Sequence, residues 1–157
     1  MRWSFACALH DLAKRDERVV LLMGDVGGGL LSTFAKDFPD RYYNLGTAEQ
    51  SMVGIAAGMA LQGLRPVVYS FTPFLLERAF EQLKIDVDSN DAPALLVGWE
   101  DQTQGITHAA LDSVHTLQVF KKIRTVQPST EDDVKTWFAE TNPDSWPAFM
   151  LLKEPKK

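Results

Sequence analysis

The feature that most constrains the fold of this chain is a regular alternation of short apolar runs with helical patterns. Apolar runs bounded by turn residues predict buried strands, and the longer amphipathic repeats between them predict helices. The expected strands lie at 18–25, 41–46, 65–71, 92–99, 123–128 and 147–153. The expected helices lie at 3–15, 29–38, 48–61, 75–87, about 109–119 and 129–141.

Strands that alternate with helices in this way form βαβ units. The sequence therefore predicts an α/β fold with a doubly wound, mainly parallel sheet and helices on both faces. A chain of 157 residues is long enough for a domain with its own core, and no internal repeat or linker-like stretch divides it. We therefore expect a single domain over residues 1–157.

Ligands of such sheets bind at the edge formed by the carboxyl ends of the strands. In this chain four polar or glycine-rich segments follow strands at that edge, at 24–29, 44–50, 70–74 and 99–108. We therefore expect these four segments to converge on one site.

Charge and composition argue against several other classes of protein. The net charge is −5 and the Lys and Arg residues do not cluster, which argues against a nucleic-acid partner. No apolar run approaches the ~18–20 residues that a membrane span needs. The first helical pattern lacks the apolar core and cleavage site of a signal peptide, and the single cysteine, Cys7, fits a reducing compartment. We therefore expect a cytoplasmic protein in which Cys7 is a small buried residue of the first helix.

Three local motifs suggest chemistry but match their patterns poorly. "GDVGGG" (24–29) lacks the spacing of a phosphate-binding loop, so its glycines more simply permit a tight turn. His108, Asp112 and His115 have helical spacing suitable for a metal, but the chain has three histidines in all and no cysteine cluster. We predict that the chain itself holds no metal and that Asp112 and His115 make local hydrogen bonds. Ser70 lacks the flanking glycines of a hydrolase nucleophile.

Glu49 raises a different question, because it places a carboxylate at the start of a helix built from small and apolar residues. The simplest interpretation is that this carboxylate accepts backbone N–H groups and faces the positive end of the helix dipole. The alternative is that Glu49 is the polar group that a buried helix offers to a ligand. The surrounding residues favour this alternative.

The stretch "NLGTAEQSMVGIAAGMALQGLRPVVYSFTPFLLERAFEQLKIDV" (44–87) resembles the pyrimidine-binding domain of the transketolase family, which uses thiamine diphosphate. The shared features are Ala-Glu-Gln, "MVGIAAGMA", a Pro-led strand, a pair of phenylalanines and "RAFEQ". The match extends more loosely to "FACALHDLAKRDERVVLLMGDVGGG", "GITHAALD", "TVQPSTEDDV" and "PAFMLLK". The resemblance therefore implies the thiamine-diphosphate-binding fold for nearly the whole chain.

The resemblance also implies roles for individual side chains. Glu49 is expected to contact N1′ of the cofactor's aminopyrimidine and so to take part in activating the cofactor. Phe71 and Phe74 are expected to line the pocket around the pyrimidine ring, with Phe74 the better candidate for stacking. Arg78 matches the family's Arg-Ala and is expected to order the cofactor pocket or to pair with a carboxylate. His108 is expected to be a catalytic residue that reaches the substrate.

Three departures from the family pattern bear on function. Gln104 stands where the family often has an aspartate that helps to recognise a sugar hydroxyl, so Gln104 is a candidate substrate residue and an ordinary ketose phosphate donor is in doubt. The chain lacks the Gly-Asp-Gly with a downstream Asn that holds Mg²⁺ and the diphosphate in the family, and it lacks the family's C-terminal domain. The resemblance therefore implies a partner chain that supplies the diphosphate-binding motif and the metal, in a heterotetramer around a homodimeric core.

The predicted function is that of the pyrimidine-binding subunit of a split, thiamine-diphosphate-dependent transferase. Such an enzyme transfers a ketol or acyl unit between small ketose or 2-oxoacid substrates. Two alternatives stay open. One is a subunit of a 2-oxoacid decarboxylase or of a deoxyxylulose-phosphate-type synthase, and the other is a non-catalytic binding or regulatory domain.

Overall fold

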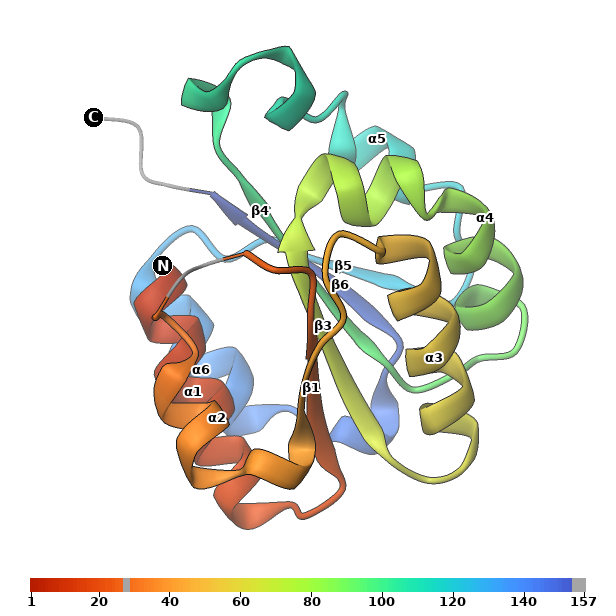
Figure 1. Cartoon of the computed structure of the whole chain (residues 1–157). Helices are drawn as coiled ribbons and strands as arrows, with labels where there is room; N and C mark the ends of the chain where they lie inside the picture. The colour runs from red at the N-terminus through yellow and green to blue at the C-terminus, as the bar shows by residue number, and fades with distance from the viewer. Residues whose placement is uncertain (27–28, 154–157) are drawn as a thin grey trace.

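A six-stranded parallel sheet forms the centre of the computed structural model, which describes residues 1–26 and 29–153 (Figure 1). The strand order is β2-β1-β3-β4-β6-β5, and each neighbouring pair is parallel. The predicted α/β fold is therefore confirmed. The strands are β1 (Val19–Met23), β2 (Tyr42–Asn44), β3 (Arg65–Phe71), β4 (Leu95–Glu100), β5 (Arg124–Val126) and β6 (Ala148–Lys153).

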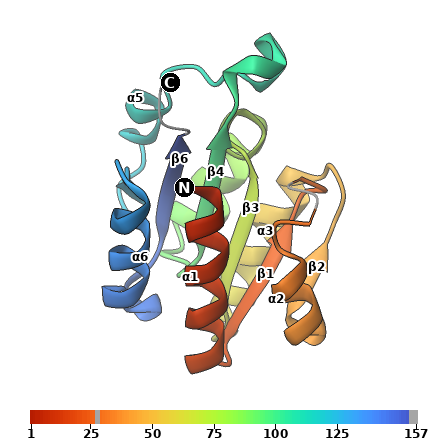
Figure 2. The same ribbon diagram turned by 90° about the vertical axis from the view of Figure 1, so that its left-hand side faces the viewer.

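Helices cover both faces of the sheet, as Figures 1 and 2 show. One face carries α1 (Arg2–Arg15), α2 (Ser32–Asp37) and α6 (Glu131–Glu140), and the other carries α3 (Glu49–Leu61), α4 (Phe80–Gln82) and α5 (Ser113–Leu117). All five residues of β1 are buried because each of its side chains enters one of the two cores. This two-sided burial explains the continuous apolar runs of the sequence. Within the described ranges, no helix is both long enough and apolar enough to cross a bilayer.

Cys7 is exposed on α1, so the expectation that it is buried was wrong. The face of α1 that packs on the sheet is formed instead by Phe5, Leu9 and Leu12, each at most 2% exposed. Cys7 follows Phe5 by two positions and therefore turns toward solvent. Helical spacing alone did not distinguish this boundary position from the buried stripe.

Two predicted helices differ from the observed structure. The helix expected at 75–87 is interrupted, because π-helical turns at Phe74–Arg78 and Leu83–Asp88 flank the short α4. The helix expected at about 109–119 is reduced to α5, in which the side chain of Asp112 accepts the first-turn N–H of His115. The apolar residues before Asp112 are not a buried helix face, since Leu111 is 74% exposed and its N–H donates to Glu77 Oε1 at 2.7 Å.

The segment between β4 and α5, drawn in teal at the top of Figure 1, stands beyond the carboxyl edge of the sheet. It includes most of 99–108, where the sequence predicted a polar segment at the ligand-binding edge. It contains two short 3₁₀ turns, Gln102–Gln104 and Ile106–His108, joined at Gly105, whose φ is 83°. At the start of α6, Thr130 and Asp133 form a reciprocal capping box.

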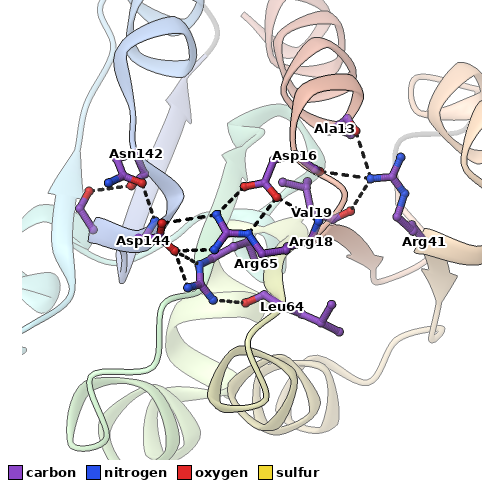
Figure 3. A network of polar contacts seen from close by, with 10 residues as sticks. Ala13, Asp16, Arg18, Val19, Arg41, Leu64, Arg65, Asn142 and Asp144 are labelled. Atoms are coloured by element: carbon purple, nitrogen blue, oxygen red, sulfur yellow. Dashed lines mark hydrogen bonds and ion pairs between the residues drawn. The ribbon is translucent and has the colours of Figure 1, made fainter.

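A network of charged residues lies at the opposite, amino-terminal edge of the sheet (Figure 3). Arg18, just before β1, donates to Asp16 at 2.8 Å and to Asp144 at 2.7 Å. Arg65, the first residue of β3, also donates to Asp144, at 2.9 Å through Nε. Hydrogen bonds from Arg18 and Arg65 lower the pKa of the Asp144 carboxyl. The network therefore joins the starts of β1 and β3 to the turn that precedes β6.

Candidate active site

The strand order creates a natural binding position between β1 and β3. From β1 the chain runs outward to β2 and then returns through α3 to β3 on the other side of β1. Connections therefore leave β1 and β3 in opposite directions at their carboxyl ends, which leaves room for a ligand at this switch point. The first residue of α3, Glu49, lies here, directly beside the end of β1.

Glu49 is buried, with 1% of its surface exposed, and the contacts described for its carboxylate come from side chains. The hydroxyl of Ser70 donates to Oε1 at 2.8 Å, and Nη1 of Arg78 donates to Oε2 at 3.0 Å. The N-terminal cap of α3 is Ala48, and it makes no side-chain capping bond. The carboxylate is therefore held by two elements that follow it in the chain, β3 and the Phe74–Arg78 turn, rather than by local capping.

Close packing leaves Glu49 little freedom to move. A Cβ atom at Gly24, just beyond β1, would lie 3.1 Å from Glu49 Oε1, 3.1 Å from Ser70 Oγ and 3.3 Å from Met52 Sδ. Only a residue without a side chain fits this position without displacing these atoms. Gly24 therefore allows the backbone to form one wall around the carboxylate.

Ser70 was missed as a site residue, because its sequence context was tested only against a hydrolase motif. Its position follows from the register of the sheet. In β3, Phe71 faces the core beneath α1, so the preceding Ser70 faces α3 and Glu49. A serine among the buried residues of this strand was the available signal.

Four ring systems form a cluster next to Glu49. The ring of His108 lies 4.7 Å from that of Phe71 and 4.9 Å from that of Phe74, with edge contacts to both. Phe71 also lies 4.7 Å from Trp99, which ends the apolar part of β4 and was not among the expected site residues. The guanidinium of Arg78 lies over the ring of Phe74, with Cζ 4.1 Å from the ring centroid. The structure thus brings together Phe71, Phe74, Arg78 and His108, although they come from two separate segments.

Gln104, the other expected substrate residue, is exposed in the first 3₁₀ turn. Its side-chain Nε2 donates to Asp101 Oδ2 at 2.8 Å, and Asp101 Oδ1 accepts from the hydroxyl and the N–H of Thr103. These hydrogen bonds, led by the Thr103 hydroxyl, and the nearby His108 lower the pKa of Asp101. A carboxylate only accepts hydrogen bonds, so Asp101 holds the amide nitrogen of Gln104 toward itself. The amide oxygen of Gln104 therefore faces away from Asp101.

Contacts link the four segments that were expected to converge. Gly24 borders Glu49, and Asp25 and Asn44 exchange hydrogen bonds of 3.2 and 3.1 Å. The ring contacts of His108 join the segment after β3 to the segment after β4. The glycine run of 24–29 is described only in part, because Gly27 and Gly28 lie outside the described residues.

The structure gives no support to the metal or hydrolase motifs. Asp112 caps α5, as expected of a local hydrogen-bonding role, and His115 is exposed. In the described part of the chain, no group of three or more His, Cys, Asp or Glu side chains is arranged to hold a metal ion. The hydrogen bond described for the Ser70 hydroxyl goes to Glu49 and not to a histidine.

Comparison with known sequences identifies the family of this chain. The family model for "Transketolase, pyrimidine binding domain" matches residues 1–155. One subunit of the apulose-4-phosphate transketolase of Actinobacillus succinogenes is 38% identical over 109 residues, which cover 67% of this chain and 35% of that protein. The 1-deoxy-D-xylulose-5-phosphate synthase of Methylobacillus flagellatus is 36% identical over 139 residues, covering 83% of this chain and 22% of that protein. The chain therefore spans only a minor part of the length of these relatives.

Solved structures show the same architecture. A split gene transketolase, described as an inactive beta4 tetramer, superposes with a TM-score of 0.85 at 25% identity, covering 97% of this chain and 50% of that chain. A transketolase from Leishmania mexicana superposes with a TM-score of 0.81 at 17% identity, covering 99% and 26%, and shows the shared fold. With the family model matching residues 1–155, this chain belongs to the transketolase pyrimidine-binding domain family.

Proposed function

We propose that this chain is the pyrimidine-binding subunit of a split, thiamine-diphosphate-dependent transferase of the transketolase type. The observation that carries the proposal is the carboxylate of Glu49, which is 1% exposed, fixed by two side chains and located at the switch point of the sheet. Burying a carboxylate costs free energy even when it is paired, which favours a functional role for this one. Ligands of such sheets bind at this point.

The residues around Glu49 suit the aminopyrimidine ring of the cofactor. A pyrimidine has flat, weakly polar faces and nitrogen atoms at its edge, so it needs an aromatic wall beside a hydrogen-bonding group. Phe74 and Phe71 supply the wall, and Glu49 supplies the hydrogen bond to N1′. The flat guanidinium of Arg78 contacts both Phe74 and Glu49, which supports the proposal that a planar nitrogen-rich group fits this corner.

Thiamine diphosphate would supply a carbon nucleophile and an electron sink for breaking and forming bonds next to a carbonyl group. In the proposed reaction Glu49 holds N1′ of the aminopyrimidine and exchanges a proton with it. Ser70 orients the carboxylate from the protein side through Oε1. Because the carboxylate is shielded from bulk water, its hydrogen bond to N1′ is stronger than it would be in solvent.

We propose that His108 and Gln104 face the substrate. The ring of His108 packs against the phenylalanine pair at the carboxyl edge, and from there it would exchange protons with a substrate oxygen. Gln104, held by Asp101, offers an uncharged acceptor to a hydroxyl group. An amide at this position replaces the carboxylate with which the family often recognises a sugar hydroxyl, which favours a substrate other than an ordinary ketose phosphate.

The other half of the site is proposed to come from a second chain. That partner would carry Gly-Asp-Gly and a downstream Asn and would hold Mg²⁺ and the cofactor's diphosphate. The relative named as a transketolase subunit and the neighbour described as a split gene transketolase support this arrangement. We propose further that residues 1–157 act as one domain and that two copies form the core of a heterotetramer with two partner chains.

A deoxyxylulose-phosphate-type synthase, which joins a 2-oxoacid to an aldehyde, is the second candidate. Relatives named as 1-deoxy-D-xylulose-5-phosphate synthase favour it, at 36% identity over 139 residues. A panel of ketose phosphates, free ketoses and 2-oxoacids, each offered with an aldehyde acceptor, distinguishes the two. Release of CO₂ from a 2-oxoacid identifies the synthase or a decarboxylase.

The first experiment is to tag this chain, recover it from a lysate of its own source and identify the co-purifying chain by mass spectrometry. The reconstituted complex is then assayed with wild-type chain, Glu49→Gln and the control Glu81→Gln, which changes an exposed glutamate of α4. Glu49→Gln should lower turnover about a hundredfold or more, because an electrostatic contact to the reacting system is lost. Equal turnover in Glu49→Gln and wild type would refute the proposed role, and recovery of the chain with no catalytic partner would favour a non-catalytic domain.

A further inference from the structure

Arg78 makes an unusual pair of contacts for a residue at the rim of a cofactor site. Its Nη1 donates to Glu49 Oε2 at 3.0 Å, and its Cζ lies 4.1 Å from the centroid of the Phe74 ring. The guanidinium is thus a flat cation that stacks on an aromatic face while its edge N–H groups bind a buried carboxylate. These are the same two contacts that the proposed function assigns to the aminopyrimidine.

The side chains of Glu49, Arg78 and Ser70 differ in their exposure to solvent. The side chain of Glu49 is 0% exposed, whereas that of Arg78 is 45% exposed. Ser70 is also 0% exposed and contacts Oε1 from within the protein. Of these two partners of the carboxylate, Arg78 is the one that is exposed to solvent, so it is the partner that a ligand arriving from solvent would displace to reach Oε2.

We propose that the guanidinium of Arg78 occupies the place of the aminopyrimidine in the unloaded chain and is displaced when the cofactor binds. This inference rests on the proposed function. A guanidinium and an aminopyrimidine that carries the shared proton at N1′ are both flat, present an N–H donor to the Glu49 carboxylate and present π faces to Phe74. Their similarity at this one corner makes them competitors for Glu49 and Phe74.

The arrangement has a physical reason in the unloaded protein. A carboxylate as buried as Glu49 is strongly destabilising without a positive partner, so an empty pocket would weaken the fold. Arg78 neutralises it until the ring arrives. Once displaced, Arg78 can remain hydrated because almost half of its side chain already meets solvent. Binding of the cofactor therefore exchanges one planar partner of Glu49 for another.

The test uses the chain alone, with 4-amino-5-hydroxymethyl-2-methylpyrimidine as the probe, and follows binding by chemical-shift changes in NMR spectra. Wild type is compared with Arg78→Met, which removes the planar cation, and with Arg78→Lys, which keeps the charge without the stacking plane. The matched control is Arg124→Met, an exposed arginine on β5 that bonds the carbonyl of Ser145. Arg78→Met should bind the probe about tenfold more tightly than wild type, since a half-exposed ion pair and a cation–π contact no longer compete.

Arg78→Lys should fall between the two, and Arg124→Met should match wild type. Millimolar guanidinium chloride should displace the probe from Arg78→Met, because the guanidinium ion can occupy the position that the Arg78 side chain has in the wild type. If Arg78→Met does not fold, the comparison of Arg78→Lys with wild type carries the test. Equal or weaker probe binding by the Arg78 variants, including binding too weak to detect at millimolar probe, would overturn the inference.

A further variant separates this inference from the proposed function. Adding Glu49→Gln to Arg78→Met should weaken probe binding, because the carboxylate is the proposed acceptor. If that double variant binds as well as Arg78→Met, the site assigned to the aminopyrimidine is wrong. If Glu49→Gln weakens binding but Arg78→Met gains nothing over wild type, only the competition between Arg78 and the ring is refuted.

Discussion

Replacing Gly98 by alanine should destabilise this protein far more than one added methyl group normally does. Gly98 lies in the centre of β4, where it pairs with Ser70 of β3. A Cβ atom at Gly98 would lie 2.6 Å from Thr72 Oγ1, 3.0 Å from Phe149 Cε1 and 3.1 Å from Thr72 Cα. The last of these is a backbone atom, so rotation of a side chain cannot relieve the whole clash.

The magnitude follows from what must move. Overpacking a buried position costs about 1–3 kcal/mol, and the backbone contact with Thr72 places Gly98→Ala near the upper end, at about 3 kcal/mol. With a urea m-value of about 2–2.5 kcal/mol/M, the unfolding midpoint should fall by roughly 1.2–1.5 M. Thr72 directly follows Phe71, so the displacement should also reach the ring cluster and weaken binding at the site.

The assay is urea unfolding followed by circular dichroism, with Gly58→Ala as the matched control. Gly58 lies on the exposed side of α3, and a Cβ there would meet nothing within 4 Å. Gly58→Ala should therefore stabilise the protein by about 0.5–1 kcal/mol, since alanine favours the helix. Gly98→Ala combined with Thr72→Ala should recover part of the loss, because the 2.6 Å contact disappears. A loss below about 1 kcal/mol for Gly98→Ala would refute the overpacking argument.

Three further predictions concern the site and its support. Ser70→Ala should weaken cofactor binding by the complex about tenfold while leaving the urea midpoint within about 0.5 M, as expected when one buried hydrogen bond to Glu49 is lost; titration of the cofactor into the complex measures this. Asp101→Asn should reverse the amide of Gln104 and raise the substrate KM about tenfold with little change in circular dichroism. Burial raises the pKa of Asp88, but hydrogen bonds from the N–H groups of residues 121–123 lower its pKa by more. The ionised Asp88 therefore stabilises the fold fully above the unfolded-state pKa of about 4, and this stabilisation is lost as the pH falls below that value. Asp88→Asn should therefore be less stable than wild type at pH 7, and urea midpoints for the two should converge as the pH falls below about 4.

The sequence was sufficient for the sheet because its strands are buried on both faces. A run such as Val19–Met23 has no polar alternation, and two-sided burial is the only simple way to satisfy it. The helix expected at 75–87 carried an ordinary helical pattern, and nothing in that pattern distinguishes π-helical turns from α-helical ones. The helix expected at about 109–119 was wrong in its first part because exposed apolar residues such as Leu111 imitate a buried face.

The candidate site could be predicted only where its residues lie close together in a recognisable stretch. Glu49, Phe71, Phe74 and Arg78 came from one such stretch, and His108 came from a second. Ser70, Gly24 and Trp99 were missed because their roles depend on strand register and on contacts between segments. The contact between Arg78 and Glu49 likewise spans 29 residues of sequence and becomes visible only when α3 and β3 are assembled.

The charged network at the amino-terminal edge of the sheet implies that local unfolding is unevenly distributed across the domain. Arg18, Arg65 and Asp144 link the starts of β1 and β3 to the turn before β6, while the segments at the carboxyl edge end in exposed turns. Amide hydrogens near the starts of β1, β3 and β6 should therefore exchange with deuterium only through global unfolding, whereas those around residues 101–112 should exchange through small local openings. Segments at the carboxyl edge of such a domain can then change in sequence or conformation while the whole sheet still unfolds cooperatively.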